Sequence, residues 1–126
     1  MTSDEFKNFA ERYAKAWCSR DPEAVVAFYA KNASISVNDG APAPIGEVAR
    51  SFMRDFPDMV VTFDKLEPCE DRFAFHWTLT GSYAANGNKV CISGYELWKI
   101  DNDGLIAESK GHFDAADYER QLRAGK

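Results

Sequence analysis

The stretch NGNKVCISGYELWKIDNDG, residues 86–104, contains one strand between two turn signals. Asn86-Gly87 is the dipeptide most typical of a tight hairpin, and DNDG at 101–104 is a second turn signal. The run 88–100 between them alternates in the way that a half-buried strand does. The stretch therefore predicts the middle strand of an antiparallel meander, with one strand before it and another after it.

The alternation places one acid on an apolar face of this strand. Glu96 shares its face with Val90, Ile92, Gly94, Trp98 and Ile100. The opposite face carries Cys91, Ser93, Tyr95, Leu97 and Lys99. In the preceding run the aromatic face consists of Phe73, Phe75, Trp77 and Leu79, and the other face of Ala74, His76, Thr78 and Thr80. Glu96 is therefore the residue of the sheet that most needs an explanation.

The rest of the sequence adds helices on the N-terminal side. Helices are expected at 2–19, where Thr2 and Glu5 fit a capping box, then in RDPEAVVAFYA (20–30), then at 47–56, with a short one from Ala115. A short strand is expected at 33–37 and a loop at 38–46, and the four later strands at 59–68, 71–83, 88–100 and 104–113. We expect a single α+β domain spanning residues 1–126, in which a curved antiparallel sheet wraps around three N-terminal helices.

Composition excludes several classes of function. The net charge is −5 and no segment clusters lysine and arginine, so a nucleic-acid partner is not expected. No apolar signal core or membrane-length run is found, which predicts a cytoplasmic protein without a membrane partner. The three cysteines form no CxxC and the two histidines are not spaced as metal ligands, so we expect no disulfide framework, metal or cofactor.

Aromatic residues make up 13% of the chain, and a lined cavity is one use for so much ring surface. No serine or cysteine stands in a nucleophile motif, and the loop NDGAPAPIG lacks the lysine of a phosphate-binding loop. The sequence therefore allows a lined cavity and argues against covalent catalysis and nucleotide binding.

Three segments in order resemble a known group of proteins. They are AWCSRDPEAVVAFYAKNASI (16–35), DFPDM (55–59) and NDGLIAESKGHFD (102–114). Their order and spacing resemble the SnoaL-like group of the nuclear transport factor 2-like superfamily, which also includes ketosteroid isomerases and limonene epoxide hydrolases. The resemblance implies a cone with a deep apolar pocket for a small hydrophobic ligand. It also implies a homodimer through the outer face of the sheet, where Tyr95, Leu97, Thr78 and His76 are expected.

The polyketide cyclases of this group imply a role for Asp114. They place a general acid/base aspartate after the last hairpin, where it closes a ring without metal or cofactor. His112 would share its strand face and could relay the proton. The alternatives are that Asp114 caps the helix that follows and that His112 is a surface residue. Strict alternation also places Asp114 and Phe113 on opposite faces, and the sequence does not decide which of them faces the pocket.

The ketosteroid isomerases imply a second pair. Tyr13 and Glu96 stand close to the positions of a tyrosine and a protonated acid that bind the developing enolate. The general base of those enzymes falls near Val37, which cannot take a proton, and Asn38 and Asp39 lie just beyond. The alternatives are a core tyrosine for Tyr13, and for Glu96 a bulge that turns it outward or a buried acid without chemistry.

The limonene epoxide hydrolases fit less well. They use an Asp-Arg-Asp set, of which Asp114 matches only the last member. Asp71 and Arg72 stand at the start of a strand and look like turn residues. Epoxide hydrolysis is therefore disfavoured.

The sequence leads to one expectation and one rival. The expected pocket has Tyr13, Glu96 and Asp114 inside it and His112 at its mouth. Its expected wall consists of Trp17, Phe28, Phe52, Phe56, Phe75, Trp77, Trp98 and Phe113. The expected activity is cofactor-free acid/base cyclisation or isomerisation of a carbonyl compound. The rival is a non-catalytic ligand-binding or dimerisation domain of the same fold.

Overall fold

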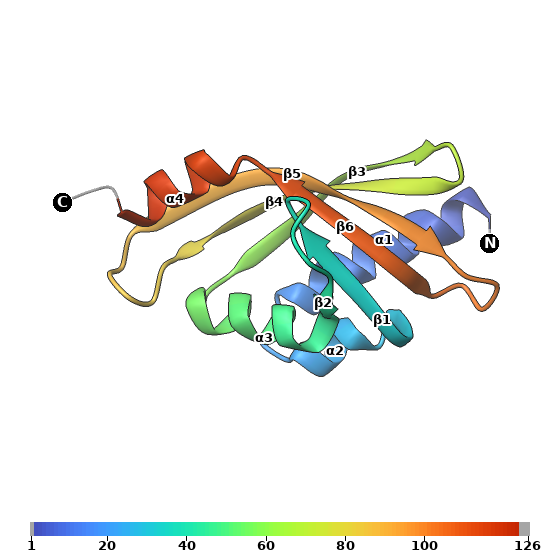
Figure 1. Cartoon of the computed structure of the whole chain (residues 1–126), viewed down its shortest axis with the longest axis horizontal. Helices are drawn as coiled ribbons and strands as arrows, with labels where there is room; N and C mark the ends of the chain where they lie inside the picture. The colour runs from blue at the N-terminus through green and yellow to red at the C-terminus, as the bar shows by residue number, and fades with distance from the viewer. Residues whose placement is uncertain (1, 124–126) are drawn as a thin grey trace.

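The computed structural model describes residues 2–123 and shows one curved sheet with α1, α2 and α3 on one side of it (Figure 1). The helices are α1 (Ser3–Trp17), α2 (Pro22–Val26), α3 (Ile45–Asp55) and α4 (Ala115–Arg123). The strands are β1 (Tyr29–Val37), β2 (Ala43–Pro44), β3 (Val60–Cys69), β4 (Arg72–Ser82), β5 (Lys89–Ile100) and β6 (Ile106–Phe113). The predicted α+β architecture is confirmed.

The sheet has six strands in the order β2-β1-β6-β5-β4-β3. Strands β3 to β6 form the predicted antiparallel meander, since each of them pairs antiparallel with the next. Strand β1, however, pairs parallel with β6, so the complete sheet is mixed and the expectation of a wholly antiparallel sheet is wrong on this edge. This pairing joins two distant parts of the chain, because parallel neighbours need a long crossover between them.

Helix α1 is fixed at its start by side chains and along its length by aromatic packing. The backbone N–H of Glu5 donates to Thr2 Oγ1 at 3.1 Å and that of Thr2 to Glu5 Oε1 at 2.8 Å, which confirms the predicted capping box. The buried stripe of the helix consists of Phe9, Ala10, Tyr13, Ala14, Ala16 and Trp17. It packs against the concave face of the sheet, where Phe75 and Trp98 are also buried.

The second helix is shorter than predicted. It ends at Val26, and β1 already begins at Tyr29, four residues before the predicted strand. Tyr29 pairs with Ile106 of β6 and is 5% exposed, so tertiary pairing and burial outweigh the local helical pattern. The predicted loop 38–46 likewise contains β2 and the first residues of α3.

The predicted faces of β4 and β5 are confirmed. Phe75, Leu79, Ile92 and Trp98 are buried on the concave side, whereas Cys91, Ser93 and Lys99 are exposed on the convex side. Glu96 is 7% exposed and lies on the concave face, as the alternation predicts. None of the helices within residues 2–123 is long and apolar enough to cross a membrane.

Two glycines on the concave face differ in what they tolerate. Gly94 pairs with both Trp77 and Phe113, and a Cβ there would lie 2.3 Å from His112 O and 2.8 Å from Trp77 Cζ2. A Cβ on Gly111 would meet nothing closer than Ser36 O at 3.6 Å. Gly94 is thus required by close packing, whereas Gly111 leaves space beside it.

Gly94→Ala should therefore destabilise the protein, because overpacking of a tight site costs about 1–3 kcal/mol. Gly111→Ala is the matched control and should change the free energy of unfolding by less than about 1 kcal/mol. Urea unfolding of both variants measures the difference. Equal stability of the two variants would contradict the close packing at Gly94.

Candidate functional site

A cavity of about 60 Å³ lies between the concave face of the sheet and helices α1 and α3. Its wall consists of Trp17, Ile35, Val37, Val48, Phe52, Val61, Phe75, Trp77, Leu79, Glu96, Gly111 and Phe113. Glu96 is the one ionisable residue in this wall. A dry apolar cavity of about 150 Å³ can hold benzene, so a five- or six-membered ring enters this cavity only where its wall moves.

Five of the eight predicted wall residues line the cavity. They are Trp17, Phe52, Phe75, Trp77 and Phe113. The structure adds apolar residues that the sequence analysis did not assign to the wall: Ile35, Val37, Val48, Val61 and Leu79, together with Gly111. The aromatic content drew attention to the rings, but the inward faces of β1 and β3 carry aliphatic side chains that alternation alone would have indicated.

The other three predicted wall residues do not line the cavity, so their assignment to the wall is wrong. Phe28 packs edge-on against Phe9 and Tyr13. Phe56 ends α3 and packs against aromatic rings at the far end of the sheet. Trp98 is fully buried, with its ring stacked on Phe75 at 4.8 Å between centroids.

The carboxyl group of Glu96 is the centre of a buried polar network. Its Oε1 accepts hydrogen bonds from Tyr13 Oη at 2.9 Å, Trp98 Nε1 at 2.9 Å and Ser109 Oγ at 3.0 Å. The donors come from α1, β5 and β6, so one oxygen atom connects a helix to two strands. Tyr29 also stabilises the charged form of this carboxyl group.

Two tyrosines extend the network. The hydroxyls of Tyr13 and Tyr29 lie 2.8 Å apart, and both side chains are buried. Burial, together with the nearby Glu96, raises the pKa of each phenol well above its ordinary value, so both hydroxyls remain protonated donors. Sequence analysis placed Tyr13 beside Glu96 but missed Tyr29 and Ser109. Tyr29 was assigned to a helix, and Ser109 gave no signal except its inward position on the strand.

Burial raises the pKa of Glu96 above its ordinary value. Hydrogen bonds from Trp98, Tyr13 and Ser109 act in the opposite direction, because they stabilise the carboxylate, but desolvation is the larger effect. The alternative in which a bulge turns Glu96 outward is therefore wrong. A buried acid whose charged form is disfavoured is the kind of group that active sites use for proton transfer, and structural networks also contain such groups.

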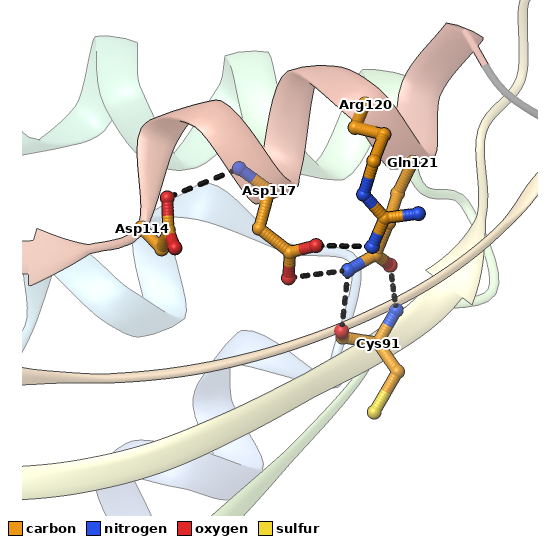
Figure 2. A network of polar contacts seen from close by, with 5 residues as sticks. All are labelled: Cys91, Asp114, Asp117, Arg120 and Gln121. Carbon is orange, nitrogen blue, oxygen red and sulfur yellow. Dashed lines mark hydrogen bonds and ion pairs between the residues drawn. The ribbon is translucent and has the colours of Figure 1, made fainter.

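Asp114 lies outside the cavity, so the expectation that it projects into the pocket is wrong. It is exposed, and its Oδ1 accepts a hydrogen bond at 3.1 Å from the backbone N–H of Asp117 in the first turn of α4 (Figure 2). This is the helix-capping alternative. Phe113 faces the cavity instead, as strict alternation along β6 requires.

His112 does not stand at the mouth of the cavity. It lies on the convex face, where its ring centroid is 5.2 Å from that of Tyr95, and His76 lies 5.7 Å from Tyr95 on the other side. The physical reason is the same alternation, since His112 points opposite to Phe113. His76 also contacts Glu67 Oε1 at 2.9 Å, in agreement with its predicted outward position.

The structure also shows where the residues implied by the ketosteroid isomerases and the limonene epoxide hydrolases lie. Val37 lines the cavity, whereas Asp39 is exposed and has φ of 64°, so no base from this loop reaches the wall. Arg72 opens β4 and pairs with Glu108 at 2.6 Å, away from the cavity. Within residues 2–123 no group of three or more histidine, cysteine or acidic side chains is arranged to hold a metal ion.

Helix α4 is attached to the sheet by the side-chain amide of Gln121, which bonds to the backbone of β5 as a neighbouring strand would (Figure 2). The amide of Gln121 accepts from the backbone N–H of Cys91 at 2.7 Å and donates to the Cys91 carbonyl at 3.0 Å. Asp117 holds this amide through a hydrogen bond to Gln121 Nε2 at 2.9 Å and also pairs with Arg120. On its inner side Tyr118 packs against Phe113 and Phe52 of the cavity wall.

Comparison with known proteins places the chain in a family. Residues 10–109 match the family described as SnoaL-like domain. A search of curated proteins finds no significant match.

Many solved structures share the fold. TsrD from Streptomyces laurentii superposes with a TM-score of 0.82 at 19% identity, over 99% of each chain. A protein with a ketosteroid isomerase-like fold from Catenulispora acidiphila, in complex with trimethylamine, gives 0.78 at 14% identity over 90% of each chain. A candidate SnoaL-like polyketide cyclase from Jannaschia sp. CCS1 gives 0.77 at 13% identity, over 98% of this chain and 92% of that one. At these identities the likeness shows the fold and not the reaction.

The raised pKa of Glu96 predicts a pH-dependent contribution to stability. Above 4.5, the ordinary pKa of glutamate, the unfolded chain has released this proton while the folded protein still holds it. The free energy of unfolding that Glu96 contributes should thus be fully present below that pH and should fall as pH rises through the higher folded-state pKa.

Glu96→Gln removes this titration and keeps an acceptor for the three donors. The variant should become progressively more stable relative to wild type as the pH increases, by about 1.4 kcal/mol for each unit by which the pKa is raised. Denaturant unfolding at a series of pH values measures it, with Glu11→Gln on the exposed side of α1 as control. A constant difference between wild type and Glu96→Gln across the pH range would contradict the prediction.

Proposed function

Because this chain belongs to the SnoaL-like domain family and buries one carboxyl group in the wall of an apolar cavity, we propose that it binds a small hydrophobic molecule there and uses Glu96 to move a proton on it. The observation that carries the proposal is the isolation of Glu96. It is a buried acid with a raised pKa, and the rest of the cavity wall is not ionisable.

The chemistry of a single carboxyl group limits the reaction. In its ionised form Glu96 is a stronger base than an exposed carboxylate, because burial disfavours the charge. It can remove a proton from the carbon next to a carbonyl group and return the same proton to another carbon of the resulting enol. Return of the proton to another carbon gives an isomer. Where a second carbonyl is in reach, the enolate carbon can instead form a C–C bond to that carbonyl carbon, and Glu96 then returns the proton to the alkoxide oxygen, which gives a closed ring. This cofactor-free isomerisation or cyclisation is the activity that we propose.

The size of the cavity supports a small substrate. At about 60 Å³ it is too small for several fused rings unless its wall moves. The aromatic wall residues Phe52, Trp77 and Phe113 are only partly buried, so they can shift with less loss of packing than the fully buried Phe75. The structural neighbour from Catenulispora acidiphila was crystallised with trimethylamine, a molecule of suitable size.

The alternative function is ligand binding without chemistry. Val37 stands where a ketosteroid isomerase places its base, and Asp114 caps a helix outside the cavity. A binding protein that keeps the cavity but has no catalytic group at positions 37 and 114 would show this same arrangement. The two proposals differ in whether Glu96 exchanges protons with the bound molecule.

We also propose a homodimer through the convex face of the sheet. The large hydrophobic side chains most exposed within residues 2–123, Val60 at 50% and Tyr95 at 37%, both lie on this face. Leu97 and the two histidines beside Tyr95 extend the patch. Such a surface gains free energy when a second copy covers it.

The dimer can be tested by sedimentation equilibrium at micromolar concentration. Wild type should sediment as a dimer and Tyr95→Glu as a monomer, because the variant would bury two carboxylates in an apolar interface. Asn102→Glu, in the exposed turn between β5 and β6, adds the same charge and should remain dimeric. A monomeric wild type would overturn the proposal.

The proton transfer can be tested with 3-cyclopentenone, a small ketone with a double bond two carbons away from the carbonyl carbon. Wild type should accelerate its conversion to 2-cyclopentenone, followed by proton NMR. Glu96→Gln should lower the rate by about 10²- to 10⁴-fold, the usual contribution of a general acid/base. The Glu11→Gln variant is the control and should retain the wild-type rate.

Two results would argue against catalysis by Glu96. A wild-type rate no faster than buffer, with the ketone bound, would favour the non-catalytic alternative. A Glu96→Gln variant as fast as wild type would assign the chemistry to another group.

A further inference from the structure

Helix α4 lies beside the least buried part of the cavity wall. Phe52, Trp77 and Phe113 of the wall are only partly buried. The ring of Tyr118 in α4 packs edge-on against Phe113, with centroids 5.3 Å apart, and lies 6.5 Å from the ring of Phe52. Phe52 belongs to α3 and Phe113 ends β6, so Tyr118 connects the two sides of the cavity at this end.

The contacts that hold α4 on the sheet are mostly polar. None of the described residues of α4 is buried. Gln121 makes two hydrogen bonds to the backbone of Cys91 (Figure 2), and the amides of Asn86 and Asn88 donate to the carbonyl of Leu122 at 2.7 and 2.9 Å. Water replaces such bonds when the helix leaves, so each is worth only about 2- to 10-fold in an equilibrium constant. Helix α4 therefore separates more readily than α1, whose aromatic stripe is buried.

A single residue, Asp114, connects β6 to α4. Its side chain accepts from the backbone N–H of Asp117, and its carbonyl accepts from that of Tyr118 at 3.0 Å. Both bonds lie within the segment that would turn, so neither has to break when α4 leaves the sheet. Phe113 directly precedes this hinge, and a turn of α4 therefore moves a wall residue together with Tyr118.

The opposite end of the cavity cannot open in this way. Phe75 is buried and stacked on Trp98 at 4.8 Å between centroids, and Trp17 is held edge-on by Tyr13. The closed cavity of about 60 Å³ is much smaller than the roughly 150 Å³ that holds benzene. A ring-sized ligand therefore needs a moving wall, and the end beside α4 is the part that moves without disruption of the core.

We propose that α4 is the gate of the cavity. It turns about Asp114 to admit an apolar ring and closes again over the bound molecule, and Tyr118 limits the size of the molecule that fits beneath it. This inference rests on the proposed function, because it explains how a ligand larger than the closed cavity reaches Glu96. It makes Tyr118 a specificity-determining residue that does not itself line the cavity.

The first test weakens the gate without a change in the cavity wall. Gln121→Ala removes both hydrogen bonds to Cys91, and fluorine NMR exchange spectroscopy measures the entry and exit rates of fluorobenzene. Both rates should rise by about 5- to 30-fold, the worth of two neutral hydrogen bonds. The Kd should change by less than about 2-fold, because α4 is closed with and without ligand. Glu119→Ala, which removes only an exposed ion pair with Arg123 of the same helix, should keep the wild-type rates.

The Cys91 amide reports the gate in the absence of ligand. Its N–H donates to Gln121 Oε1 at 2.7 Å, so it should exchange with solvent when α4 leaves the sheet. Tyr118→Ala removes the ring at the cavity but none of the bonds to Cys91. The variant should accelerate exchange of the Cys91 amide by about 5-fold or more, because the packing of Tyr118 holds the same helix. Glu119→Ala should leave this exchange rate unchanged.

Tyr118→Ala also tests the limit on ligand size. The space that the tyrosine ring leaves should lengthen the cavity toward α4. The variant should therefore bind 1-fluoronaphthalene at least about 10-fold more tightly than wild type does, because a second ring gains apolar contact. Its affinity for fluorobenzene should rise less. An unchanged preference between the two probes would show that Tyr118 does not limit ligand size.

The outcomes separate the gate from the proposed function. Fluorobenzene exchange in Gln121→Ala that is as slow as in wild type would overturn the gate and leave ligand binding in the cavity intact. The same conclusion follows if Glu119→Ala accelerates exchange equally, or if Tyr118→Ala leaves the Cys91 amide fully protected. Wild type that binds 3-cyclopentenone but not fluorobenzene would also overturn only the gate. Wild type that binds neither molecule would overturn both proposals.

Discussion

The burial of one carboxyl group is the constraint on which the rest of this structure depends. Glu96 can stay inside because Tyr13, Trp98 and Ser109 donate to one of its oxygens. These donors tie α1 to β5 and β6, so the network that satisfies the acid also fixes the helix against the sheet. An apolar residue at this position would leave three donors without an acceptor, which is why the site does not behave as an ordinary part of the core.

The cavity and the acid depend on each other. Apolar walls exclude water from Glu96 and so disfavour its charge, and the same absence of water makes hydrogen bonds to a ligand stronger. Small residues create the space, since Gly111 lies beside Glu96 and lacks the side chain that would fill it. A protein selected only for stability would close such a gap, because empty apolar space forfeits packing. The gap is thus consistent with a site that a ligand fills.

The period-2 pattern of β4 and β5 was enough to predict the meander, its faces and the position of Glu96. The sequence predicted only residues 33–37 of β1, because its first residue, Tyr29, belongs to a locally helical pattern that pairing with β6 overrides. The acid at 114 was misplaced for a different reason: capping a helix and lining a pocket call for the same residue type, and only the bend after β6 separates them.

The hydrogen bonds of Gln121 affect how readily this protein associates with other polypeptide chains. Strand β6 stops pairing at Gly94, so the backbone of β5 beyond that point would present free N–H and C=O groups to any passing chain. The amide of Gln121 occupies those groups at Cys91. Helix α4 therefore blocks the addition of a strand from another molecule at this edge of β5. Protein that lacks α4 should form fibrils or precipitate more readily, even though no residue of α4 lines the cavity.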